Sequence, residues 1–336
     1  MAQIPHQVFS GPPIGVASQG EVKPGAEAAS VAVEHRTGAP TPSCAASGGS
    51  GMVEPIVTAV VPCFNHGHFL AECIGSLRAQ TLPNWRAIVV NDCSTDGTTA
   101  ALCDAQAGAQ ITVVHLPHNL GRSGARNHGI ALATTEAILS PDADDALHPH
   151  HLATTVPALL AAPTIGIAYT DYTLFGAQQG IWRSKPFNIK RLYREQYIYA
   201  GSMFRKSAWA ATHGYSDDFA IGNEDWDFWL TLVEAGWQGV HVPQALFRYR
   251  IHAQSWTSQV DMHGQDRAYR SCLLLLEHHR QGFERHGTER AFLAGAKGRE
   301  ALRLRTSGQR EQAQAMWRQV ARLRPWDVMA HLRSWL

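Results

Sequence analysis

The 336-residue chain has almost no net charge, no paired cysteine motif and no long apolar run. Its 29 Lys and Arg against 28 Asp and Glu give a formal charge of +1, whereas a general nucleic-acid binder carries a basic excess. We therefore expect no nucleic acid among its partners. No apolar stretch approaches the roughly 18 residues that span a bilayer, and no basic-then-apolar signal pattern opens the sequence. These absences favour a soluble, cytoplasmic protein.

Cysteine and histidine give little sign of a disulfide framework or a metal cage. The 6 cysteines contain no CxxC pair, and disulfide frameworks are typical of short secreted chains, so reduced thiols are expected. Most of the 18 histidines lack metal-ligand spacing. His278 and His279 are neighbours on a predicted helix, where adjacent residues do not share a face, and we expect both to be exposed.

Composition divides the chain into three parts. In residues 1–52 Phe9 is the only aromatic residue, and 29 of the 52 positions are Ala, Gly, Pro or Ser, which predicts a disordered leader. Residues 53–260 alternate short apolar strands with helix-length segments. Residues 261–336 carry helical patterns only.

The alternation predicts βαβ units and thus an α/β fold, with a mainly parallel sheet and helices on both faces. Pro62, which we expect to end the first strand, Asp92 and the acidic run 142–145 each follow a predicted strand. Ligands of such sheets gather at the carboxyl ends of the strands, so these residues should lie along one edge. The predicted strands cover residues 56–61, 87–90, 111–115 and 137–139, with shorter ones near 201–204, 240 and 247–249.

Asp142, Asp144 and Asp145 place three carboxylates within four residues. Unpaired, they would raise one another's pKa, and a divalent cation would relieve that repulsion. The alternative is a turn with an N-cap for the helix that begins near Pro149, for which one carboxylate suffices.

Glu224 and Asp225 open another predicted helix. Acidic residues there are favoured by the helix dipole alone. They could equally supply a general base, for which Trp226 and Trp229 would form an apolar wall. The local sequence does not separate these interpretations.

Two basic segments complete the candidates. The Gly-rich loop 119–127 offers backbone N–H groups with Arg122 and Arg126 to a phosphate, although it lacks the Gly-Lys-Ser/Thr of a P-loop and the GxGxxG spacing of a dinucleotide site. Arg250 and His252 alternate on a predicted strand and so face the same side. A single histidine is more often structural than a ligand.

Taken together, these segments resemble the family 2 glycosyltransferases with a GT-A fold. The match begins at Val60-Val61-Pro62-Cys63-Phe64-Asn65 and covers about residues 56–255, with the motifs in the family's order. It implies a GT-A-type nucleotide-diphospho-sugar transferase fold, here followed by a C-terminal helical extension. The matching motifs are residues 89–97, 119–121, 125–127, 142–145 and 224–225.

The resemblance also implies roles for individual residues. Asp225 would be the catalytic base, and Glu224 would support it or bind the acceptor. The residues expected to bind the donor nucleotide are Pro62, Phe64, Asn65, Asp92, Arg122 and Arg126. Those expected around a Mn²⁺ or Mg²⁺ ion are Asp142, Asp144, Asp145 and His252.

The function implied is that of an inverting, metal-dependent glycosyltransferase in surface glycan or polysaccharide synthesis. It would move a sugar from a nucleotide-sugar, expected to be a UDP-sugar, to a saccharide or lipid-linked acceptor. One alternative is a non-catalytic scaffold that recruits partners through its helical tail. A nucleotidyltransferase is disfavoured, because residues 62–66 after the first strand are not a Gly-rich basic loop.

The helical tail allows two further interpretations. Residues 308–313 and Pro325 resemble the second half of a tetratricopeptide repeat, although a helical hairpin packed on the catalytic domain fits as well. From Lys297 onward there are 9 Lys and Arg against 3 Asp and Glu. Such a tail could contact the inner face of an anionic membrane, or it could be a solvated surface.

Overall fold

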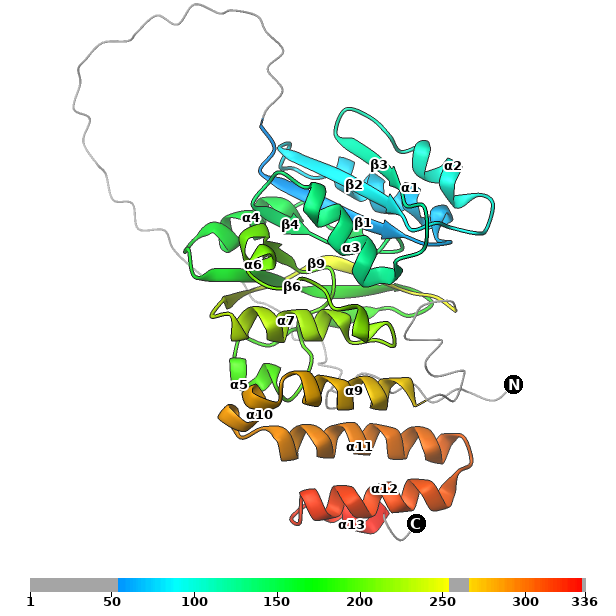
Figure 1. Cartoon of the computed structure of the whole chain (residues 1–336), viewed down its shortest axis with the longest axis vertical. Coiled ribbons are helices and arrows are strands. Elements are labelled where there is room, and N and C mark those ends of the chain that lie inside the picture. The colour runs from blue at the N-terminus through cyan, green and yellow to red at the C-terminus, as the bar shows by residue number, and fades with distance from the viewer. Residues whose placement is uncertain (1–53, 254–265, 334–336) are drawn as a thin grey trace, which may run out of the picture. The chain divides into compact units, whose positions relative to one another are not determined.

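The structure is a computed structural model that describes residues 54–253 and 266–333 (Figure 1). The predicted leader, residues 1–52, and the predicted boundary between 260 and 261 lie outside these residues. The described residues belong to one structural unit, Val53–Leu336. Among them, no helix combines the length and the apolar character needed to cross a bilayer.

A mixed sheet of nine strands organises the described residues, in the order β3-β2-β1-β4-β8-β6-β9-β5, with β7 paired to β6. The first four strands of the chain are parallel, as predicted, and β8 is antiparallel to β4 and β6. The α/β fold with a C-terminal helical extension is therefore confirmed. The strands are β1 (Val57–Cys63), β2 (Trp85–Asn91), β3 (Ile111–His115), β4 (Ala137–Leu139), β5 (Ala146–Leu147), β6 (Ile165–Gly176), β7 (Gly180–Trp182), β8 (Met203–Arg205) and β9 (Gln238–Ile251).

Helices connect and cover the strands. α3 packs against β1 and β2, α4 packs against β6 and β9, and in the tail α11 lies between α9 and α12 (Figure 1). A short 3₁₀ helix, Asp217–Phe219, precedes α7. The α-helices are α1 (Gly67–Arg78), α2 (Thr99–Asp104), α3 (Gly121–Leu132), α4 (His151–Leu160), α5 (Ile189–Leu192), α6 (Lys206–Ala210), α7 (Glu224–Glu234), α9 (Arg267–His278), α10 (Arg280–His286), α11 (Glu289–Thr306), α12 (Arg310–Leu323) and α13 (Val328–Arg333).

The first strand does not end at Pro62, as the sequence predicted, but continues to Cys63. The reason lies in the neighbouring strands. β2 pairs with β1 along its whole length, whereas β4 pairs only with residues 57–59 of β1. A proline has no backbone N–H to donate to a neighbouring strand. At Pro62 no β4 residue is paired with β1, so the missing hydrogen bond does not end the strand.

The two short strands expected near Val240 and 247–249 are one long strand, β9. Val242 pairs with Thr170 of β6 and Ala245 with the next residue, Asp171, so Pro243 and Gln244 form an irregularity in the ladder. A proline within a strand is tolerated at such a bulge. The strand therefore reaches residue 251, beside the loop that follows β4.

The C-terminal helices hold α7 in place. Asn223, the residue before α7, donates from Nδ2 to Ser271 Oγ of α9 at 2.8 Å. His279 joins Asp227 and Glu234 of α7, with nitrogen–oxygen distances of 2.9 Å to each.

The prediction that His279 is exposed was therefore wrong, since only 4% of the residue is accessible. Burial alone would lower the pKa of His279, but its two carboxylate partners outweigh burial and raise the pKa to about 9. The carboxylates that pair with His279 lie 45 and 52 positions away in the sequence. The position of His279 next to His278 on the helix therefore could not predict its burial.

The contact between α3 and the sheet generates a first prediction. A Cβ on Gly129 would lie 2.4 Å from Val60 Cγ1, so Gly129→Ala should destabilise the protein by about 1–3 kcal/mol in chemical denaturation. Gly75→Ala is the matched control. No atom lies within 4 Å of a Cβ built on Gly75 in α1, and this change should stabilise by about 0.5–1 kcal/mol. Equal effects of the two changes would show that the α3 packing is misassigned.

Candidate active site

Hydrogen bonds join the loop after β1 to the loop after β2, at the sheet edge where the predicted donor-binding residues lie. Asn65 adopts a left-handed conformation with φ 56°, and its Oδ1 accepts from the backbone N–H groups of Thr95 and Asp96 at 2.8 and 3.2 Å. Asn is among the residues that tolerate this conformation best. The Asn65 side chain, predicted to bind the donor, is thus engaged in shaping the loop after β2.

Asp92 ties the end of β2 to the loop before α3. Its Oδ1 accepts from the backbone N–H of Leu120 at 2.7 Å, and its carbonyl oxygen accepts from Asn119 Nδ2 at 3.0 Å. Burial raises the pKa of Asp92 above its ordinary value. Nearby, Pro62 is buried in β1, whereas Phe64 is 43% exposed at the rim of this edge.

A buried arginine joins the parts of the site that come from different elements. The guanidinium of Arg126, on α3, is wholly inaccessible and donates from Nη1 to Glu224 Oε1 at 2.9 Å and from Nη2 to Asp142 Oδ1 at 2.5 Å. Burial alone would lower the pKa of Arg126, but the two carboxylates raise it, so the group stays charged. In this arrangement Arg126 holds two acids in position, and its side chain is not exposed to solvent.

Arg122, one turn earlier on α3, is the more accessible of the two predicted arginines. Its side chain is 37% exposed, and Nη1 lies 3.3 Å from the same Glu224 oxygen. Glu224 is therefore held between two guanidinium groups.

The two adjacent acids of α7 have opposite electrostatic surroundings. Burial alone would raise the pKa of Glu224, but Arg122 and Arg126 outweigh burial and hold the pKa below its ordinary value. For Asp225, burial and the neighbouring Glu224 charge both act upward and raise the pKa to about 7. A carboxylate with a pKa near neutrality can accept a proton in the physiological range, whereas Glu224 stays ionised. Burial and charge thus give these adjacent acids different protonation behaviour, which the local sequence alone did not indicate.

Gln196 is a site residue that the sequence did not indicate. Its Nε2 donates to Asp225 Oδ2 at 2.6 Å, and the backbone N–H of Trp226 donates to the other oxygen, Oδ1, at 2.9 Å. The carboxylate of Asp225 is therefore oriented from two sides. Gln196 lies in the irregular segment between α5 and β8, where no motif marks it.

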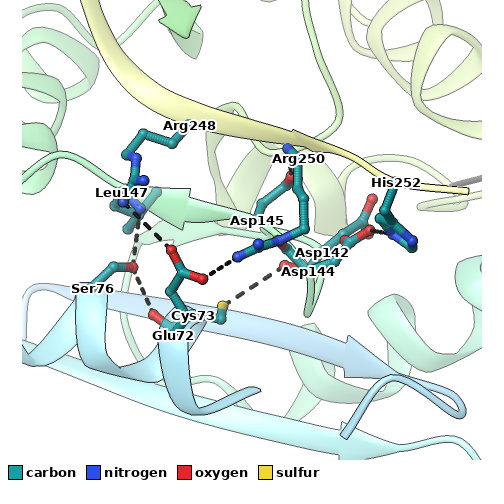
Figure 2. Close-up of polar contacts among 10 residues, drawn as sticks. All are labelled: Glu72, Cys73, Ser76, Asp142, Asp144, Asp145, Leu147, Arg248, Arg250 and His252. Atoms are coloured by element: carbon teal, nitrogen blue, oxygen red, sulfur yellow. Dashed lines mark hydrogen bonds and ion pairs between the residues drawn. The ribbon is translucent and has the colours of Figure 1, made fainter. Parts of the chain in front are cut away.

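The three acids after β4 form a tight group. Oxygen atoms of Asp142, Asp144 and Asp145 all lie within 4.8 Å of one another. Asp144 Oδ2 is 2.8 Å from His252 Nε2, and Asp145 Oδ1 accepts from the backbone N–H of Arg250 at 2.9 Å (Figure 2). The predicted metal residues are thus brought together, with His252 in contact with Asp144.

Arg250 locks this group to α1. Its Nε donates to the carbonyl oxygen of Asp144 at 2.6 Å, and its guanidinium pairs with Glu72 of α1 (Figure 2). The guanidinium also lies 4.2 Å from the ring centroid of Phe175 on β6. The sequence placed Arg250 beside His252 but gave no signal for Glu72, whose role depends on a partner 178 positions away.

The clustered carboxylates of Asp142, Asp144 and Asp145 are suited to bind a divalent cation. Asp145 is buried, and burial together with Asp144 and Asp142 places its pKa well above the ordinary value. Three clustered carboxylates offer only hard oxygen donors, which Mg²⁺ and Mn²⁺ prefer. A cation there would offset both the burial and the repulsion that raise the pKa of Asp145.

Comparison with known proteins now decides the family. Residues 58–227 match the family model "Glycosyl transferase family 2", which is about half of the chain. The chain belongs to glycosyltransferase family 2. It is a glycosyltransferase, and the motifs that resembled this family on sequence alone all lie within the matched region.

Several relatives and solved structures agree with this assignment. The chain is 26% identical over 230 residues to EpsE of Bacillus subtilis, covering 65% of this chain and 82% of EpsE. It is 30% identical over 210 residues to TuaG of the same organism, covering 61% and 82%. A third relative, RfbC of Myxococcus xanthus, is 28% identical, and the match covers 68% of this chain and 18% of RfbC.

The fold is shared with solved structures at low identity. Staphylococcus aureus TarS 1–349 in complex with UDP-GlcNAc has a TM-score of 0.56 and 16% identity, covering 83% of this chain and 88% of that one. The mannosyltransferase PcManGT of Pyrobaculum calidifontis, in complex with GDP-Man and Mn²⁺, has the same TM-score and identity, covering 84% and 85%. At this level of identity the likeness establishes the GT-A fold.

The buried arginine generates a second prediction. Arg126→Met would leave Glu224 and Asp142 without their common partner, and we expect a loss of about 3–5 kcal/mol in the free energy of unfolding. Arg122→Met is the matched control, because its partly exposed pair should contribute less than about 1 kcal/mol. Urea denaturation measures both. A small effect at Arg126 would contradict its role as the link between the two acids.

The raised pKa of Asp225 generates a third prediction. Below pH 7 the carboxyl binds a proton and can no longer accept one, so kcat/KM should fall about tenfold per pH unit in the acidic range. The apparent pKa of that limb should lie near 7. A rate profile that stays flat from pH 7 down to pH 5 would exclude Asp225 as the titrating base.

Proposed function

We propose that this glycosyltransferase is inverting and metal-dependent, and that it moves a sugar from a UDP-sugar to a hydroxyl of a saccharide or lipid-linked acceptor. The observation that carries the proposal is the separation of roles in α7, where Asp225 has a pKa of about 7 beside an ionised Glu224. One poised carboxylate suits a single displacement, since a base is needed only on the acceptor side. The scaffold alternative gives no reason for this separation.

The acceptor side of the reaction needs only residues of this chain. Asp225 takes the proton from the acceptor hydroxyl as that oxygen forms a bond to the anomeric carbon. The bond from the anomeric carbon to the diphosphate oxygen breaks on the opposite face, and the electron pair leaves with the nucleoside diphosphate. Gln196 and the Trp226 N–H keep the carboxylate aimed at the acceptor. One displacement inverts the anomeric configuration.

On the donor side, Pro62, Phe64 and Asp92 bind the nucleoside, with Asp92 accepting from a base N–H. Asn65 supports that subsite by fixing the loop after β2. Arg122 meets the diphosphate, since it is the accessible arginine of α3. These assignments follow the family resemblance and the positions described above.

The metal site consists of Asp142, Asp144 and Asp145, with His252 positioning Asp144. When bound there, Mn²⁺ or Mg²⁺ supplies positive charge that stabilises the departing diphosphate. Arg250 and Glu72 hold the loop that carries these acids in register with α1.

The relatives support a role in building surface polysaccharides. TuaG is named for teichuronic acid biosynthesis and RfbC for O-antigen biosynthesis. The solved neighbours are complexed with UDP-GlcNAc or with GDP-Man. We propose a UDP-sugar as donor, and thermal stabilisation by UDP-sugars but not GDP-sugars in the presence of Mn²⁺ would distinguish the two.

The role of Asp225 generates a fourth prediction. Asp225→Asn should lower kcat by at least about a thousandfold, because no group remains to accept the acceptor's proton, while the Kd for UDP stays unchanged. Single-turnover assays and titration calorimetry measure the two quantities.

Stability provides the control for that variant. The pKa of Asp225 is raised from 3.8 to about 7 in the folded state, so the stability it contributes is full below pH 3.8 and is lost as the pH rises through 7. At pH 8 the Asn variant should therefore be at least as stable as the parent protein. Turnover within tenfold of the parent would eliminate Asp225 as the base.

The acidic group generates a fifth prediction. Asp144→Ala should abolish the rise in melting temperature that Mn²⁺ plus UDP produces, because the metal-dependent part of donor binding is lost. Asp104→Ala, at an acid that is 65% exposed and pairs with His115, should leave the rise intact. If both variants respond to Mn²⁺ plus UDP as the parent does, the metal site is misplaced.

A further inference from the structure

The last helix exposes an apolar surface that the catalytic site does not use. Four large apolar residues there are each at least 53% exposed, and Trp326 reaches 79%. We call this surface the α13 apolar face; it consists of Trp326, Val328, Met329 and Leu332. Soluble proteins rarely expose large contiguous apolar patches, and such patches mark sites of interaction.

Within α13 the helix geometry makes the exposed apolar residues neighbours. Val328 and Met329 lie four and three positions before Leu332, so their side chains are neighbours on the helix. The opposite side of α13 is anchored by Ala330, which is buried with Trp317 and Val320 of α12. The helix is therefore docked through a small residue, with its large apolar residues turned outward.

Asp327, the acid that directly precedes α13, is already engaged. Asp327 Oδ1 accepts from the backbone N–H of Ala330 at 3.0 Å, as an N-terminal cap of α13 does. Around it the chain is basic, since Lys297 to the end carries 9 Lys and Arg against 3 Asp and Glu. Arg318 and Arg322, one turn apart on α12, are both exposed. The guanidinium of Arg333, on α13, lies 5.0 Å from the ring centroid of Trp317, on α12.

The basic charge around the α13 apolar face indicates which kind of partner binds it. A second copy of the chain would bring the same basic charge and repel the first. An anionic lipid bilayer offers both an attractive surface charge and an apolar layer. A tryptophan beside aliphatic residues, flanked by arginines, is the composition of helices that lie in the membrane interface.

We propose that the α13 apolar face, with Arg318 and Arg322, docks this protein onto an anionic bilayer. The four apolar side chains enter the region between headgroups and acyl chains, and the arginines remain at headgroup level. This surface is separate from the residues assigned to catalysis, so the proposal does not depend on the proposed function.

Vesicle sedimentation of the full chain tests the proposal. The protein should pellet with vesicles of phosphatidylcholine and phosphatidylglycerol at low salt, and it should remain in the supernatant with phosphatidylcholine alone. The double change Met329→Ser with Leu332→Ser should lower the partition coefficient at least about tenfold. Leu302→Ser on α11, at a residue that is 42% exposed, is the matched control and should bind as the parent does.

The charge contribution is tested separately. Arg318→Gln with Arg322→Gln should lower the partition coefficient about 25-fold on anionic vesicles, since each arginine near such a surface contributes a factor of about five. Unchanged melting temperatures and unchanged transfer to a soluble acceptor in both double variants show that only docking is affected. Equal sedimentation of parent and variants would overturn the proposal. So would light scattering showing a dimer that Met329→Ser with Leu332→Ser dissociates, because the face would then be covered by a second copy.

Discussion

A wholly buried guanidinium stands at the centre of this structure. Arg126 on α3 bonds to Glu224 at the start of α7 and to Asp142 after β4, residues 98 and 16 positions away in the sequence. An isolated buried charge is too costly to persist, so the two carboxylates must be in place for the fold to form. The positions of α3, α7 and the β4 loop relative to one another are therefore coupled.

The remaining features of the site follow from this coupling. Because Arg126 and Arg122 keep Glu224 ionised, its charge acts on Asp225 and helps to raise the pKa of that neighbour. The C-terminal helices reinforce the arrangement from the other side, through Ser271 on Asn223 and through His279 on Asp227 and Glu234. The helical tail thus contributes to the position of α7, whatever else it binds.

Much of the fold could be predicted from the sequence, because local patterns determine it. The strands at 111–115 and 137–139 have the predicted bounds, and the parallel order of β1, β2 and β4 places Pro62, Asp92 and the acidic run at one edge. The parts that were missed depend on distant partners. Glu72 meets Arg250 across 178 positions, and burial of His279 depends on Asp227, 52 positions away. No local pattern encodes either contact.

The stereochemistry of transfer tests the central claim most directly, since a single base at Asp225 implies a single displacement. Proton NMR of the product, formed from the nucleotide-sugar that stabilises the protein with Mn²⁺, gives the anomeric configuration of the new glycosidic linkage. The account predicts that an α-linked donor yields a β-linked product. An α-linked product would require two displacements or a front-side attack, and would contradict the role assigned to Asp225.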